Sequence, residues 1–231
     1  PVPYSFKDEH GQWQTITLYD LSPSSPEDKF IIVNPEAGKY GSLLITPKNK
    51  YTGITFSLNK RFSDNWMFHI DYTYSQAKGN HANTYGGGSW GGISYENPNR
   101  QINASGYLDY DAPHALTVCG TVVLPLDFVL TPRFSYQSGW NWTRNIRASG
   151  IEGSPTVIIE SRGSQRLPAQ IALDVRLEKV FAFTERMKLS LILDAFNILN
   201  RGVETWVQTR VTSTNFGLAT SVCEPRYYRV G

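Results

Sequence analysis

The feature that most constrains this chain is a set of three strand pairs in which apolar and polar residues alternate. Successive side chains of a β-strand point to opposite faces, so apolar residues at every second position mark a strand with one apolar face. The pairs occupy residues 51–78, 113–138 and 169–199, and a last strand begins within 226–231. In the first pair the apolar positions are Ile54, Phe56, Leu58, Trp66, Phe68, Ile70, Tyr72 and Tyr74. The chain is therefore predicted to be all-β.

The lengths of the connections separate two kinds of all-β protein. Short turns join the strands of each pair at residues 63–65, 125–127 and 184–186. Long segments join one pair to the next at residues 77–113, 139–168 and 200–225. Soluble β-sandwiches usually keep connections to about 4–6 residues, whereas outer-membrane barrels alternate short periplasmic turns with long extracellular loops. We therefore predict antiparallel strands of a transmembrane β-barrel in the bacterial outer membrane.

Charged residues fall on the polar face of these strands. The polar positions carry Asp71, Arg133, Asp174, Arg176, Glu178 and Asp194. Charges in the core of a sandwich would need partners, but they suit a hydrated barrel lumen, and the apolar face then meets lipid. We therefore predict that these residues face the lumen. Aromatic residues near the strand ends predict interfacial girdles, with Phe181 and Phe183 on the periplasmic side and Tyr136 and Trp140 on the outer side.

Two parts of the sequence fit this pattern less well. Pro132 lies in the middle of a strand and cannot donate to a β-ladder, which predicts a bulge or a local loss of pairing. Residues 1–50 are assigned as strand and loop without fixed boundaries: 12–19 and 30–33 are strand-like, but prolines interrupt the alternation. Counting these two segments, about seven to nine strands are expected.

Composition excludes several other classes of protein. The net charge is only +2 and the basic residues are scattered, so no nucleic-acid partner is expected. No apolar run reaches the roughly 18 residues of a membrane-spanning helix. Cys119 and Cys223 are too few for a disulfide framework or a cysteine zinc cluster, and whether they pair stays open, with unpaired thiols favoured. The chain begins at Pro1 with neither an initiator Met nor a secretory signal, so a preceding segment is expected to be missing.

Several motifs resemble those of a known family. The first strand pair contains Y-T-G-I-T-F at 51–56, K-R-F-S-D-N-W at 60–66 and D-Y-T-Y-S at 71–75. Further along lie D-A-P-H-A-L-T-V at 111–118, D-A-F-N-I-L-N at 194–200 and E-P-R-Y-Y-R-V-G at 224–231. In this order they resemble the strand motifs of TonB-dependent receptors, and more narrowly those of Oar-like receptors, which carry a carboxypeptidase-regulatory-like domain. The resemblance spans residues 51–231.

The resemblance implies the C-terminal part, about the last third, of a barrel of about 22 strands with a plugged lumen. The plug, its energy-coupling box and the terminal aromatic of the last strand would lie outside this chain. The function implied is active import of a scarce nutrient, such as a metal chelate, a glycan or a peptide. Implied partners are outer-membrane lipid, the rest of the barrel and plug, and an inner-membrane TonB-type energy coupler reached through the missing segments.

No covalent chemistry is expected, and hence no catalytic residue, cofactor or metal site. The glycine-rich run at 86–92 lacks the Lys-Ser/Thr ending of a phosphate-binding loop, and the four histidines lack the spacing of metal ligands. His69 shares a face with Asp71, and His114 shares one with Asp109 or Asp111, as a general base and its partner would. Any polar lumen wall offers the same spacing.

Ligand contact is expected in the extracellular loops, where aromatic and Arg side chains stack on sugars or hold anionic chelates. The candidates are Tyr85, Trp90, Tyr95, Trp140, Trp142 and Arg144. Trp140 and Trp142 are equally consistent with girdle residues. Two alternatives stay open: a self-contained outer-membrane barrel of about eight strands acting as an anchor or adhesin, and a soluble all-β binding module, which the charges of Asp174, Arg176 and Glu178 disfavour.

Overall fold

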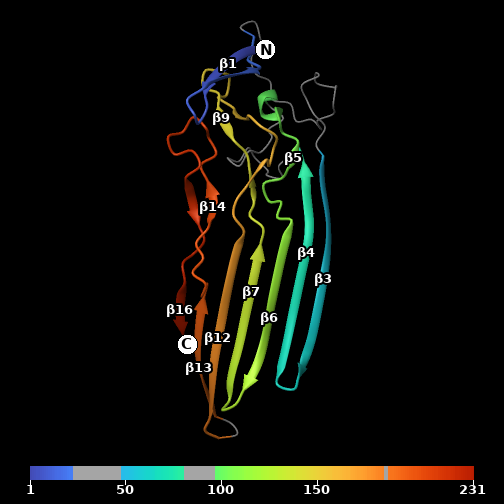
Figure 1. Ribbon diagram of the computed structural model, residues 1–231, viewed down its shortest axis with the longest axis vertical. Coiled ribbons are helices and arrows are strands. Elements are labelled where there is room, and N and C mark those ends of the chain that lie inside the picture. Colours follow the sequence, from blue (N-terminus) through green and yellow to red (C-terminus); the bar gives the residue numbers. More distant parts are fainter. Residues whose placement is uncertain (23–47, 81–96, 185–186) are drawn as a thin grey trace.

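The structure is a computed structural model of the chain, and it describes residues 1–22, 48–80, 97–184 and 187–231. One antiparallel sheet dominates, and its long strands lie side by side in Figure 1. Its order is β16-β13-β12-β7-β6-β4-β3, with β5 paired to β4. The bounds are β3 Asn49–Ser63, β4 Trp66–Gly79, β5 Gly106–Tyr107, β6 His114–Leu124, β7 Phe128–Gln137, β12 Gln170–Ala182, β13 Lys188–Phe196 and β16 Tyr227–Val230. The segment 51–78 lies within the pair β3–β4, the segments 113–138 and 169–199 contain the pairs β6–β7 and β12–β13, and β16 lies within 226–231.

Two turns at the lower end of the sheet in Figure 1 use left-handed backbone. Asp64 and Asn65 have φ of 53° and 68°, and they join β3 to β4 as a two-residue turn. Positive φ at both central residues gives a type I′ turn, whose twist matches that of the strands. Leu126 and Asp127 also have positive φ, 63° and 56°, in the turn between β6 and β7. Aspartate and asparagine tolerate this conformation, but leucine does not favour it.

The Y-T-G segment of β3 has a structural explanation. A Cβ atom placed on Gly53 would lie 3.1 Å from Tyr51 Oη and 3.3 Å from Tyr51 Cε1. The ring of Tyr51 therefore covers the glycine two residues away on the same face of the strand. Such aromatic cover compensates for the missing side chain of a glycine in a sheet.

Pro132 perturbs the pairing of β7 less than expected. The register from β7 to β12 passes through the Pro132–Val175 pair without a shift, so the predicted bulge is wrong. On the other side, the β6–β7 ladder stops at Cys119–Arg133 and resumes at Val122–Leu130 in the same register. The predicted local loss of pairing is confirmed on that side alone, because proline has no N–H to donate.

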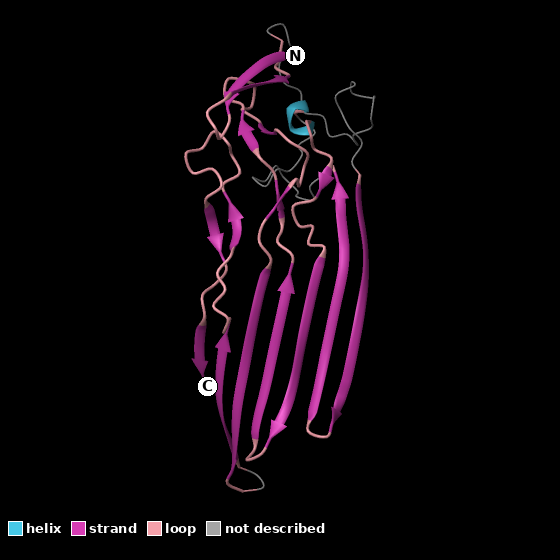
Figure 2. Cartoon of the chain, in the orientation of Figure 1, coloured by secondary structure: helices cyan, strands magenta, loops and turns pink. Residues whose placement is uncertain are grey.

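The long connections fold into short strands and loops at the end of the sheet opposite the tight turns (Figures 1 and 2). We call residues 1–22, 97–113, 138–169 and 197–226 the loop cap. Its elements are β1 Val2–Lys7, β2 Trp13–Leu18, η1 Pro98–Gln101, β8 Asn141–Trp142, β9 Asn145–Arg147, β10 Thr156–Ile158, β11 Gln165–Arg166, β14 Glu204–Val207 and β15 Ala219–Val222. Its core consists of Phe6, Leu18, Ile146, Ala148, Ile151, Val157 and Val211. No helix in the described part of the chain is long and apolar enough to cross a membrane.

The cap corrects one expectation about the N-terminal region. The strand-like segment 12–19 does form β2, but it pairs only with β1 in a separate two-stranded sheet. It adds no strand to the large sheet, which we call the wall. The apolar side of β2 packs against the cap core, where Leu18 is fully buried. Residues 30–33 lie outside the described residues.

Candidate functional site

The register separates the large sheet into an apolar face and a polar face. Cross-strand pairs such as Phe56–Tyr72 and Leu58–Ile70 form the apolar face. The alternate pairs form the polar face, and all the residues predicted to face the lumen lie on it: Asp71, Arg133, Asp174, Arg176, Glu178 and Asp194. The assignment of this face to the lumen stays a prediction, and its polarity supports it.

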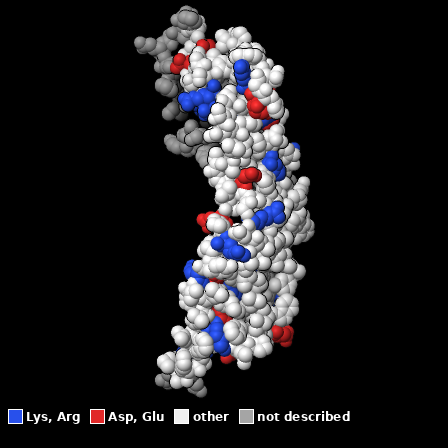
Figure 3. All heavy atoms as spheres, turned by 60° about the vertical axis from the view of Figure 1, so that its left-hand side comes forward, with Lys and Arg blue, Asp and Glu red and all other residues white. Residues whose placement is uncertain are grey.

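A row of ion pairs crosses the polar face near β13. Asp194 is 4% exposed and accepts hydrogen bonds from Arg176 Nε at 2.7 Å and Arg176 Nη2 at 3.1 Å. Arg229 adds two more, from Nε at 3.0 Å and Nη2 at 2.6 Å. Sequence reasoning missed Arg229, although its place between Tyr228 and Val230 gives it polar-face parity. Both signs of charge also lie close together along the face drawn in Figure 3, which carries no large area of one sign.

The His69–Asp71 pair forms, but it is embedded in a network. Both ring nitrogens of His69 are engaged, one with Asn59 Oδ1 and the other with Asp71. Ser57 Oγ donates to Asp71 Oδ1 at 2.5 Å. An imidazole held on both sides has no free nitrogen with which to accept a substrate proton.

The second predicted His–Asp pair is wrong. His114 Nδ1 contacts the Tyr72 hydroxyl at 2.8 Å, on the apolar face. Asp109 and Asp111 instead turn into the loop cap, where arginine side chains bind them. Asp109 and Asp111 lie five and three residues before His114, and odd separations place strand side chains on opposite faces. The strand also begins only at His114, so both aspartates lie in the loop that precedes it.

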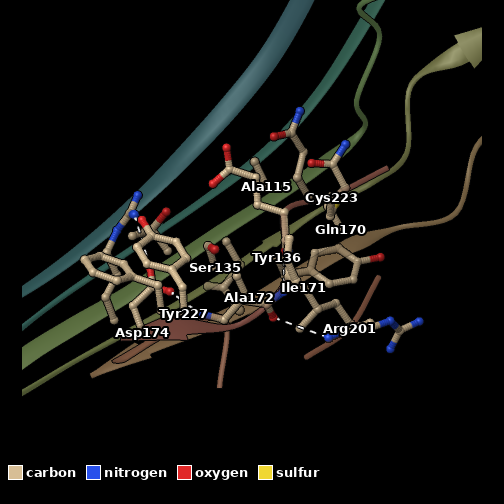
Figure 4. Close-up of a pocket in the computed structure, with 18 residues that line it drawn as sticks. Ala115, Ser135, Tyr136, Gln170, Ile171, Ala172, Asp174, Arg201, Cys223 and Tyr227 are labelled. Atoms are coloured by element: carbon tan, nitrogen blue, oxygen red, sulfur yellow. Dashed lines mark hydrogen bonds and ion pairs between the residues drawn. The ribbon is translucent and has the colours of Figure 1, made fainter. Parts of the chain in front are cut away.

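The polar face holds a groove of about 440 Å³ where the large sheet meets residues 197–201 and 223–225 of the loop cap. It lies over β6, β7 and β12 and is bounded by the segments that follow β13 and precede β16. In Figure 4, Asp174 and Tyr227 lie at one end and Gln170 and Cys223 at the other. Tyr227 stacks on Phe196 with ring centroids 4.5 Å apart, and Arg133 Nη1 lies 3.8 Å from Asp174 Oδ2. The groove therefore offers an aromatic pair, four charged side chains and several amides to a polar ligand.

The groove gathers residues that no local pattern brings together. Its lining from the wall includes Thr117, Ser135, Gln137, Gln170 and Asp174, and its lining from the later segments includes Asn197, Arg201, Cys223, Glu224 and Tyr227. The alternation gave the polar-face parity of the wall residues. It did not give the return of segment 223–227 beside them, because that depends on the pairing of β16 with β13.

The predicted ligand residues of the loops lie away from this groove or outside the described residues. Tyr85, Trp90 and Tyr95 belong to residues 81–96, which the structure does not describe. Trp140 is 39% exposed at the base of the cap. Trp142 packs edge-on against Phe216 with centroids 6.1 Å apart. Their role in ligand binding stays a prediction.

Arg144 joins two carboxylates within the loop cap. It donates to Glu9 Oε1 from Nη1 at 2.5 Å and to Glu160 Oε2 from Nε at 2.9 Å. Burial alone would lower the pKa of Arg144 and raise that of Glu160. The hydrogen bonds among these groups outweigh burial, so the pKa of Arg144 is raised and that of Glu160 is lowered. A guanidinium committed to two carboxylates is a structural tie between β1–β2 and the β8–β11 region.

A buried polar cluster ties the cap to the wall. Asp111 is 2% exposed and accepts from the Ala77 N–H of β4 at 2.6 Å, from Asn141 Nδ2 at 3.3 Å and from Arg166 Nη2 at 2.7 Å. The neighbouring Asp109 has its pKa raised by burial, an effect that the Arg162 guanidinium opposes. Among the described residues, no group of three His, Cys, Asp or Glu side chains could hold a metal ion. Both cysteines are free thiols.

The comparisons agree with this architecture. Residues 34–160, more than half of the 231 residues, match the family model for an outer membrane beta barrel domain. The chain belongs to this family. It is therefore a β-barrel chain of the bacterial outer membrane, and the tight turns and long loops of its sheet are the periplasmic and extracellular connections of such a barrel.

A solved structure resembles this outer-membrane barrel chain in fold. The outer membrane transporter YddB from Escherichia coli aligns over 80% of the chain with a TM-score of 0.54 and 15% sequence identity. The aligned region covers 25% of that transporter, so the chain spans about a quarter of its length. At this identity the likeness concerns the fold alone. No curated protein matches the sequence.

Proposed function

We propose that this chain forms wall and extracellular loops of a TonB-dependent transporter that imports a scarce nutrient, such as a metal chelate, a glycan or a peptide. The observation that carries the proposal is the polar groove on the predicted lumen face, which residues of the large sheet and of the loop cap line together. In this proposal the chain catalyses no covalent reaction and needs no cofactor.

The energy-coupled class rests on the motifs of the strands and on the size of the barrel they require. The sheet begins at β3 and ends at β16, and these two strands do not pair with each other among the described residues. Additional strands must close the barrel, and the fold neighbour that is an outer membrane transporter is four times as long as the aligned region. These observations favour a large plugged barrel over a small self-contained anchor.

The partners proposed follow from that assignment. Outer-membrane lipid covers the apolar face, further strands complete the wall, and a plug fills the lumen. An inner-membrane protein of the TonB type would pull on the plug, which lies outside this chain. No part of the proposal involves nucleic acid.

The proposal is tested with the complete protein in its native outer membrane. The gene is deleted, and growth is compared on limiting iron chelates, glycans and peptides, each as the sole source. A transporter gives a growth defect on one class, restored by the wild-type gene, and labelled uptake of that nutrient stops when a protonophore collapses the inner-membrane gradient. An anchor or adhesin gives no such defect. Uptake that persists without the gradient would contradict energy coupling while leaving a passive channel.

A matched pair of variants connects the groove to uptake. Arg133→Ala removes a groove charge from the middle of the wall, and Lys188→Ala removes a charge of the same sign at the far, periplasmic end of β13. The proposal expects Arg133→Ala to raise the half-saturating nutrient concentration about tenfold, the loss of one charged hydrogen bond. Lys188→Ala should leave it unchanged at equal protein levels.

A further inference from the structure

Three lysines lie together on the apolar face at the extracellular end of β3 and β4. Lys50 and Lys78 are direct cross-strand partners, and each is four residues beyond the Ile54–Tyr74 pair of the apolar face. The even spacing gives them the same orientation as Ile54 and Tyr74. Pairing continues one step further, because the Asn80 N–H donates to the Lys48 carbonyl at 3.1 Å. Lys48 therefore shares this orientation, and all three side chains are exposed.

In the part of the chain that the structure describes, no carboxylate pairs with this cluster. The ion pairs among the described residues involve none of the three lysines. Like charges directly opposite each other destabilise an antiparallel pair. The contact that the structure shows for Lys78 is a cation–π interaction, with Nζ 4.5 Å from the ring centroid of Tyr107. Charge complementarity thus calls for an anion between Lys50 and Lys78.

The cluster lies at the depth of lipid headgroups. Four residues of strand span about 13 Å, which becomes roughly 9 Å of depth at a tilt of about 45°. Below it, Ile54, Phe56 and Leu58 present the apolar band, each more than half exposed on this face. At the level of Ile54, on the edge of the band nearest the lysines, lie the rings of Tyr74 and His114, 5.3 Å apart. Aromatic rings of this kind sit at the interface and pack on sugars.

We propose that Lys48, Lys50 and Lys78 bind the phosphate of an anionic, phosphorylated lipid of the outer leaflet. Its acyl chains lie along Ile54, Phe56 and Leu58, and its headgroup contacts Tyr74 and His114. Clusters of basic residues at the membrane surface attract anionic headgroups by about 1 kcal/mol for each Lys or Arg. The site depends on the location in the outer membrane and is independent of what the barrel transports.

The test uses the complete protein, purified from outer membranes and exchanged into phosphatidylcholine nanodiscs that contain or lack diphosphorylated lipid A. Retained lipid is measured by native mass spectrometry. The double variant Lys50→Gln/Lys78→Gln should bind lipid A roughly thirtyfold more weakly, the equivalent of two lysines at about 1 kcal/mol each. The control Lys7→Gln/Lys188→Gln removes the same charge from the cap and the periplasmic end, and it should bind like the wild type.

Heat-modifiable migration on gels first establishes that each variant is folded. Lipid A stripped of its phosphates should bind no better to the wild type than to the double variant. Equal retention by the wild type and the double variant would overturn the proposal, as would an equal loss in the control, which would indicate bulk charge alone. Inorganic phosphate that displaces lipid A at millimolar concentration would also overturn it, because a free-phosphate site needs no acyl chain.

Discussion

The large sheet and the loop cap belong to one chain, but the sheet exposes its apolar side chains and the cap buries them. In the sheet, Ile54, Phe56 and Leu58 are 52%, 60% and 59% exposed. In the cap, Leu18, Ile146 and Val157 are 0% exposed. The sheet satisfies its backbone through long ladders and leaves its apolar side chains to be covered by lipid. The cap hides its apolar side chains from water inside a core of its own.

Because of this difference, the two regions tolerate different kinds of substitution. A wall strand is constrained residue by residue, since neighbouring positions face lipid and polar surroundings in turn. The cap is constrained by a few buried contacts between segments far apart in sequence, such as Arg144 with Glu9 and Asp111 with Arg166. The effect of a substitution on stability should therefore depend on which face of the sheet it lies on in the wall, and on which buried partner it removes in the cap.

The largest effect should come from a charge on the lipid side of the wall. Leu58 pairs with Ile70, midway between Trp66 and Tyr74, so Leu58→Lys places an ammonium near the bilayer midplane. We expect a loss of about 4 kcal/mol in folding free energy, measured by denaturant titration of the complete protein in lipid bilayers. Thr55→Lys puts the same charge on the polar face and should cost less than about 1 kcal/mol. Equal losses would mean that the two faces are not distinguished by lipid.

In the cap, removal of a buried partner should have the next largest effect. Asp111→Ala leaves the Ala77 N–H, Asn141 and Arg166 without their shared acceptor. We expect a cost of about 3 kcal/mol, moderated because Arg166 is 34% exposed. Hydrogen exchange should rise in residues 104–113 and 139–167 but not in β12 or β13. Asp111→Asn keeps an acceptor for Ala77 and should cost less; uniform exchange across the wall would contradict the separation of the two regions.

Acid should remove the stabilisation that Glu160 gives to the cap. Because the pKa of Glu160 is lowered by its hydrogen bonds with Arg144 and Ser164, its stabilisation is present above its ordinary value of 4.5 and is lost as pH falls below it through the lowered pKa. Urea titrations on either side of pH 4.5 should show a loss of cap stability at the lower pH. Glu160→Gln should cost about 1–2 kcal/mol at neutral pH and weaken that pH dependence. An unchanged dependence in the variant would assign it to other groups.

The smallest effect should be a gain, in a periplasmic turn. Leu126 holds φ of 63° and is 78% exposed, so it contributes strain and little burial. Leu126→Gly should stabilise the barrel by about 1 kcal/mol in the same bilayer titration. Leu126→Val, which adds a β-branch at positive φ, should destabilise it. Stabilisation by both variants would show that the backbone conformation is not the cause.

The wall was predictable from sequence and the cap was not, for a physical reason. A membrane imposes its requirement on every wall residue, so the alternation of residues 51–78 indicates the strands directly. Strands of two to six residues, such as β8 and β11, are too short to show a period, and they pair across more than twenty residues. Arg144 was assigned to ligand because nothing near it in sequence indicated Glu9, 135 residues away. The groove was missed for the same reason.

The order of the large sheet has a consequence for how the protein is made. In the series β3, β4, β6, β7, β12, β13 and β16, which follows the order of the chain, each strand pairs with the one before it in the series. Every new hairpin can therefore be added to the edge of the previous one, so the loop-closure entropy of each step stays small. Until the last strand docks, however, one edge with unpaired N–H and C=O groups travels with the growing sheet, and it would pair with any other edge it met. Sequential assembly is thus kinetically simple but exposes an adhesive intermediate, which must be shielded during its passage into the membrane.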